Sequence, residues 1–149
     1  MDPTEFGERW ETLVALTQAT VAATIVLSAG VLLGTLLWWR RHRPLSKQIR
    51  DSLALSLAAA LPGFVFSAEM SVRWLMYDRT GFADPDVYGS FPSTLLACLW
   101  VFVGPLLLAA SWAIRSKVRC PRSLWTLQVG HALVLIASIL ASSLAMLFI

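Results

Sequence analysis

The sequence predicts an all-α, polytopic integral membrane protein in which four transmembrane helices form an up-down bundle, with the N-terminus and the C-terminus outside. Composition is the first reason: 57% of the 149 residues are hydrophobic and 14% are charged, whereas soluble proteins carry about 25% charged residues. The hydrophobic residues also gather in four stretches, each long enough to cross about 30 Å of hydrocarbon as a helix. Finally, the basic residues gather in short connections on one side of these stretches.

The four predicted spans cover residues 12–39, 52–77, 91–114 and 124–149, and they form a single transmembrane domain over residues 1–149. Each stretch is apolar around its whole circumference, which excludes a soluble bundle of amphipathic helices. Helix is the expected conformation because lipid offers no partner to an unpaired backbone group.

Two of the spans carry a proline next to a glycine. Pro62 and Gly63 lie in the second span, and Gly104 and Pro105 lie in the third. Because these spans run in opposite directions, both pairs are expected about 15 Å from the inner side, at 1.5 Å per residue. A proline removes one backbone donor and frees the carbonyl four residues earlier. We expect packing kinks at both places, and a broken-helix binding site is the alternative.

The charges predict the orientation. Nine of the twelve basic residues lie in the connections around 40–51 and 115–123, and seven of the nine acidic residues lie on the opposite side. Basic loops remain in the cytoplasm, so both chain ends are expected outside. Only two of the basic residues are lysines, and this bias towards arginine suggests a bacterial cytoplasmic membrane. Six residues are expected to contact lipid headgroups rather than nucleic acid: Arg40, Arg41, Arg43, Arg115, Lys117 and Arg119.

Polar residues within the spans are the candidates for function. Glu69 and Arg73 lie one helical turn apart near the outer end of the second span, where they can form an ion pair. Gln18 lies at a similar depth in the first span and could hydrogen-bond to Glu69. An ion within a membrane is a functional candidate, so the pair is interpreted either as structural or as a group that moves a proton, ion or solute.

His131 in the fourth span lies near the level of the two proline-glycine pairs. We expect a histidine that is hydrogen-bonded between helices, with the carbonyls freed by the prolines as possible partners. Ligation of a porphyrin-type cofactor is the alternative, since Gly130 and Ala132 leave room beside the ring. No cofactor and no metal is the main expectation, because the cysteines and histidines show no metal-site spacing.

Small residues indicate where helices approach each other closely. Gly30 and Gly34 form a GxxxG pair in the first span, and Ala137, Ala141 and Ala145 repeat every four residues in the fourth. Such rows allow helices to associate in lipid. The neighbouring helix belongs either to this chain or to another one.

The sequence contains no phosphate loop, nucleophile elbow or zinc pattern, so an enzyme is not expected. The main functional interpretation is a small accessory or structural subunit of a larger membrane complex, packed through its small-residue faces. Its partners are the lipid bilayer and other membrane-protein subunits or copies of itself. One alternative is a homo-oligomeric, holin-like pore. The other is a small-solute or proton-coupled transporter that uses Glu69.

Overall fold

The structure of the protein is a computed structural model. It describes residues 3–76, 91–118 and 121–145. These residues form four helices and confirm the predicted all-α class. The helices are α1 (Pro3–Arg41), α2 (Lys47–Met76), α4 (Phe91–Ser116) and α5 (Arg122–Ala145).

Each helix is long and apolar enough to cross a membrane. The candidate spans are Arg9–Arg41, Lys47–Arg73, Leu95–Ser116 and Arg122–Leu144. These spans indicate a multi-pass membrane protein. The first two helices begin before the bounds of the predicted spans. The helical conformation continues into polar residues, which hydropathy does not assign to a span. The basic pair at the end of α1, Arg40 and Arg41, is favourable there because a helix C-terminus carries a partial negative charge.

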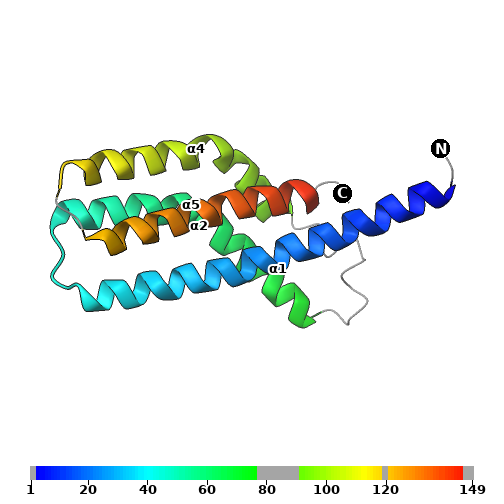
Figure 1. Ribbon diagram of the computed structural model, residues 1–149, viewed down its shortest axis with the longest axis horizontal. Coiled ribbons are helices and arrows are strands. Elements are labelled where there is room, and N and C mark those ends of the chain that lie inside the picture. The colour runs from blue at the N-terminus through cyan, green and yellow to red at the C-terminus, as the bar shows by residue number, and fades with distance from the viewer. Residues whose placement is uncertain (1–2, 77–90, 119–120, 146–149) are drawn as a thin grey trace.

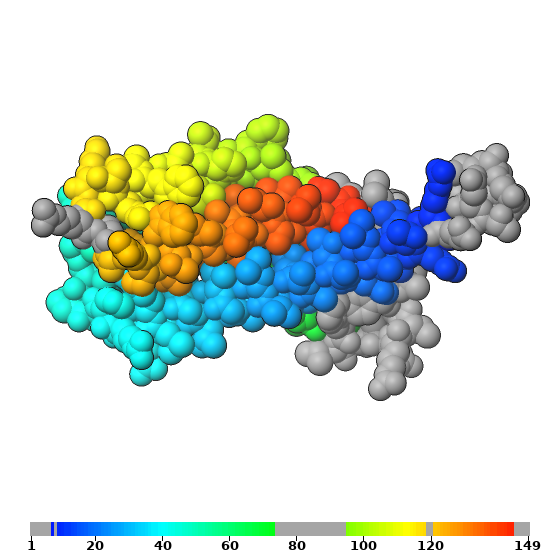
Figure 2. Space-filling model, in the orientation of Figure 1, coloured from blue at the N-terminus to red at the C-terminus, as the bar shows by residue number. Residues whose placement is uncertain are grey.

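The helices lie side by side, with α4 and α1 on opposite sides of the bundle and α2 and α5 between them (Figure 1). Both α2 and α5 contact all three other helices. On the face shown in Figure 2, α5 lies between α4 and α1 along most of its length. The start of α1 and the end of α5 lie at the same end of the bundle (Figure 1).

The buried side of α1 is more polar than its composition suggests. Buried residues follow one another at spacings of mostly three and four, a pattern close to the 3.5-residue period of coiled-coil packing. The hydroxyl oxygens of Thr17, Thr24 and Thr35 each lie 2.8 Å from the carbonyl oxygen four residues earlier, a contact that can satisfy a hydroxyl donor away from water. The buried positions are Thr17, Val21, Thr24, Ser28, Thr35 and Trp38.

Glycines bring the other helices close to α5. A Cβ atom at Gly63 would lie 2.5 Å from Val134 Cγ1 and 3.0 Å from the Val134 carbonyl oxygen. At Gly104 it would lie 2.5 Å from Leu135 Cδ2. Both prolines lie inside continuous helices, which change direction along their length (Figure 1).

The two apolar clusters of the core lie towards opposite ends of the bundle. Val21, Phe66, Met70 and Ala141 form one cluster, and Trp38, Leu53 and Leu124 form the other. Large apolar side chains cover the outside, including Val26, Phe102 and Leu106, which are 73%, 76% and 71% exposed. Apolar surface on this scale is typical of contact with lipid or with another protein.

Candidate functional site

Polar side chains line the interior of the bundle, both between the two apolar clusters and beside them. We call this set the polar interior, and all of its members are buried. Every helix contributes, and none of the buried side chains in the described ranges carries a carboxylate, amine or guanidinium group. The polar interior consists of Thr24, Ser28, Thr35, Ser52, Ser56, Ser67, Ser111, Gln128, His131, Ser138 and Ser142.

His131 connects three helices. Its Nε2 atom lies 3.1 Å from Thr35 Oγ1 of α1, and its Nδ1 atom lies 3.0 Å from Ser56 Oγ of α2. Phe64 packs against the imidazole edge to face, with ring centroids 6.5 Å apart at 87°. The ring is therefore held by a hydroxyl at each nitrogen and by an aromatic contact.

The hydroxyl groups beside His131 have more acceptors within reach than hydrogens to donate. The Thr35 hydroxyl is 2.8 Å from the Val31 carbonyl oxygen, and the Ser56 hydroxyl is 3.0 Å from the Leu53 carbonyl oxygen. Each hydroxyl has one hydrogen, and a neutral imidazole has one donor and one acceptor nitrogen. One hydroxyl must therefore donate to the ring instead of to its own helix. The arrangement can take up a hydrogen at one nitrogen and release one at the other.

The histidine partners differ from those considered from the sequence. Both ring nitrogens are engaged by hydroxyl groups rather than by the carbonyls that the prolines free. Ligation of a porphyrin-type cofactor would have to break one of these hydrogen bonds. Within the described ranges, no group of three or more histidine, cysteine or acidic side chains is arranged to hold a metal ion.

Gln128, one turn before His131 on α5, joins α2 to α4. Its Nε2 atom donates to Ser52 Oγ and to Ser111 Oγ, both at 2.7 Å. The two serines also donate to each other's backbone carbonyls, at 2.9 Å from Ser52 and 2.7 Å from Ser111. The two amide hydrogens of Gln128 and the hydroxyl hydrogens of Ser52 and Ser111 are therefore all donated. The Gln128 Oε1 atom is buried without a hydrogen-bond partner among the described residues.

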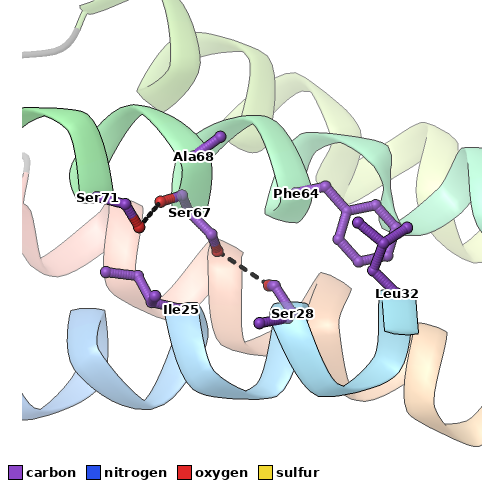
Figure 3. Close-up of a pocket in the computed structure, with 8 residues that line it drawn as sticks. Ile25, Ser28, Leu32, Phe64, Ser67, Ala68 and Ser71 are labelled. Carbon is purple, nitrogen blue, oxygen red and sulfur yellow. Dashed lines mark hydrogen bonds between the residues drawn. The ribbon is translucent and has the colours of Figure 1, made fainter. Parts of the chain in front are cut away.

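A third group of hydroxyls ties α1 to α2 and α5. Ser67 Oγ lies 2.9 Å from Ser28 Oγ and 3.3 Å from the Thr24 carbonyl oxygen. Thr24 Oγ1 in turn lies 3.3 Å from the Ala137 carbonyl oxygen. Ser28 and Ser67 face each other along a groove of about 180 Å³ between α1 and α2 (Figure 3). The groove is lined by Ile25, Ser28, Ala29, Leu32, Phe64, Ser67, Ala68 and Ser71.

The ionic pair lies outside the polar interior. Arg73 Nη2 is 3.1 Å from Glu69 Oε1, and the side chains of Arg73 and Glu69 are 26% and 29% exposed. Gln18 is half-buried on α1, and within the part of the chain that the structure describes no hydrogen bond joins it to Glu69. The structure brings Glu69 and Arg73 together and places neither of them beside His131.

The small residues of α5 and α1 have different surroundings. Ala137 and Ala141 face neighbours in the same chain, through the Thr24 bond and the cluster with Val21. Gly34 faces Leu127, whose Cδ2 atom would lie 3.7 Å from an added Cβ. Gly30, by contrast, is exposed, and no neighbour among the described residues would lie within 4 Å of a Cβ atom added there. Ala145 ends α5, and its side chain lies outside the described set.

Most of the described basic residues gather at one end of the bundle. Arg40, Arg41, Arg43 and Lys117 are exposed, and Arg115 is half-buried. Arg119 lies outside the described residues.

Sequence reasoning identified His131 but missed its partners. Serines and threonines are ordinary in apolar helices, so Thr35, Ser52 and Ser56 did not stand out. The signal that was available is on α5, where Gln128, His131, Ser138 and Ser142 recur at helical spacing on one face.

No family model, curated protein or solved structure matches this chain.

Proposed function

We propose that this chain is a non-catalytic membrane protein that serves as an accessory subunit and packs against a helix of another membrane protein through the exposed side of α1. The observation that carries the proposal is the environment of Gly30. In a helix interior, glycine is about 1 kcal/mol less favourable than alanine, and a neighbour that would clash with a Cβ atom accounts for a glycine in such a place. Gly63, Gly104 and Gly130 each have one within the chain. Gly30 has none among the described residues.

Gly30 lies in the middle of a continuous exposed seam. The seam positions are spaced by four and three residues, on the side of α1 opposite its buried positions. Small side chains lie in its first half, and they allow another backbone to approach closely. The seam residues are Ala19, Ala23, Val26, Gly30, Leu33 and Leu37.

Cross-linking in native membranes tests this proposal. Val26→Cys, in a chain whose Cys98 and Cys120 are replaced by serine, places one thiol on the seam. We expect a cross-linked product with a different membrane protein, and we expect Gly30→Ile to reduce it strongly by blocking close approach. Ala110→Ile, on the exposed side of α4, is the matched control and should leave the product unchanged.

Two results would contradict the accessory-subunit proposal. A product containing only two copies of this chain would replace it with the homo-oligomeric alternative. A product equally strong with Gly30→Ile would show that the seam does not form the contact.

We also propose that the end of the bundle with the basic residues faces the cytoplasm and that both chain ends face outward, as in a bacterial cytoplasmic membrane. The connection between α1 and α2 contains Arg43 and begins directly after Arg41, and positive charge is retained on the cytoplasmic side. An impermeant thiol reagent applied to intact cells should label Thr4→Cys and not Ser46→Cys. The reverse pattern would overturn the orientation.

A further inference from the structure

We propose that the corner between the end of α1 and the beginning of α2 binds the phosphate group of an anionic phospholipid. We define the α1–α2 corner by the five residues that line its cleft, Trp39, Arg43, Pro44, Leu45 and Arg50. The cleft has a volume of about 510 Å³. The inference is separate from the subunit contact proposed for the Gly30 seam.

Two arginines from different segments line the same cleft. Arg43 lies in the connection after α1, and Arg50 lies in the first turn of α2. No acidic residue is among the five that line the cleft. Arginine presents a planar set of donors that matches a phosphate group and can bind it through two parallel hydrogen bonds. The charge of the corner therefore favours the phosphate of an anionic lipid over that of a zwitterionic lipid, whose own ammonium group balances the phosphate charge.

One of the two arginines packs on an aromatic ring of the cleft. The Arg43 guanidinium carbon lies 5.6 Å from the centre of the Trp39 ring, a cation–π contact. Trp39, Leu45 and Ile49 pack against the buried cluster of Trp38, Leu53 and Leu124. The apolar part of the corner is therefore packed against the core, and Arg43 and Arg50 supply its positive charge.

The corner lies where apolar helix surface ends. Leu36 and Leu37 are 56% and 54% exposed, and Arg40 and Arg41 follow within one turn. A phospholipid places its phosphate at the edge of the hydrocarbon and its acyl chains beside such leucines. This position favours a lipid over free phosphate, which would gain nothing from the apolar helix surface.

The cleft at the other connection is less suited to a phosphate. Among the described residues it is lined by Trp112, Arg115, Ser116, Val118 and Trp125, which include one arginine. We assign the site to the α1–α2 corner because two arginines line its cleft.

Native mass spectrometry of the full chain, titrated with phosphatidylglycerol in detergent, tests the assignment. Arg43→Gln combined with Arg50→Gln should weaken phosphatidylglycerol binding about tenfold or more, since two charge-assisted hydrogen bonds are lost. The matched control is Lys47→Gln combined with Arg122→Gln, which removes the same charge from two exposed residues that do not line the cleft and should retain most of the binding. Thermal unfolding of each variant without lipid shows whether it is folded.

Two further titrations identify the ligand. Phosphatidylcholine should bind much more weakly than phosphatidylglycerol, and soluble glycerol phosphate should neither bind detectably nor displace the lipid. The proposal is overturned if the corner variant binds phosphatidylglycerol as the unmodified chain does. It is also overturned if the control variant loses as much binding, because general surface charge would then explain the affinity, or if glycerol phosphate competes fully.

Discussion

His131 Nδ1 lies 3.0 Å from Ser56 Oγ, and this contact links the centre of α5 to the centre of α2. Together with the bond from Nε2 to Thr35, it joins three of the four helices at one side chain. In lipid the hydrophobic effect does not drive helices together, and association depends on close packing and interhelical hydrogen bonds. The imidazole therefore acts first as a structural tie.

Replacing His131 should destabilise the bundle. His131→Ala removes two interhelical hydrogen bonds and leaves a cavity beside Phe64, and we expect the free energy of unfolding to fall by about 2–4 kcal/mol. Chemical unfolding in mild detergent, followed by circular dichroism, measures the change.

Thr35→Val is the control for the His131 replacement. It keeps the volume of the side chain and removes one hydroxyl, so the expected loss is about 0.5–1 kcal/mol. If both variants lose the same free energy of unfolding, the hydrogen bond between Thr35 and His131, rather than the packing of the imidazole ring, contributes most of the stability.

The Gln128 amide should contribute much less than its position suggests. Ser52 and Ser111 still bond to each other's carbonyls when the amide is removed, and Gln128→Leu also removes a buried oxygen without a described partner. We expect the free energy of unfolding to change by no more than about 1 kcal/mol.

Ser111→Ala makes the opposite change in the same cluster, because it leaves one of the two Gln128 amide hydrogens without its acceptor and removes the hydroxyl that donates to the Ser52 carbonyl. The expected loss is about 1–3 kcal/mol by the same measurement. A larger loss for Gln128→Leu than for Ser111→Ala would contradict this account of the cluster.

The four helices could be predicted because the signal for them is local. Each span is a long apolar run, and the charged residues near Arg40 and Arg115 mark where the runs end. The predicted bounds are those of the membrane spans, and the helices extend beyond them, since α1 begins at Pro3 and α2 at Lys47. Hydropathy locates the apolar part of a helix but not the polar turns that continue it.

The polar interior could be predicted only in part because its contacts are not local. His131 is recognisable in the sequence as a titratable side chain in an apolar run. Thr35 and Ser56 can be identified as its partners only from their distance to the ring. The row of Ala137 and Ala141 indicated a close contact, but whether the neighbour was Thr24 of the same chain depended on how the helices are arranged. Pairings of this kind require the three-dimensional arrangement of the helices.

Alanine substitutions at three glycines should have graded effects. At Gly63 an added Cβ meets Val134, including its backbone oxygen, so we expect a loss of about 1–3 kcal/mol. At Gly104 the contact is with the end of the Leu135 side chain, which can move, so the loss should be smaller. At Gly30 the space is open, and the helix preference of alanine should stabilise the isolated chain by up to about 1 kcal/mol. Thermal unfolding of purified variants gives the order, and a loss at Gly30 as large as at Gly63 would contradict it.

Glu69→Gln separates a structural ion pair from a group that moves protons. The pair with Arg73 lies within one helix, and each side chain is about one quarter exposed, a setting in which such pairs contribute about 0.3–0.5 kcal/mol. We therefore expect a fall in the free energy of unfolding of less than about 1 kcal/mol, with Arg73→Gln as the matched variant. The purified chain should also show no Glu69-dependent proton flux when reconstituted in liposomes with a pH gradient, because Glu69 lies apart from the polar interior. A flux that Glu69→Gln abolishes would favour the transporter alternative and contradict a purely structural role for the pair.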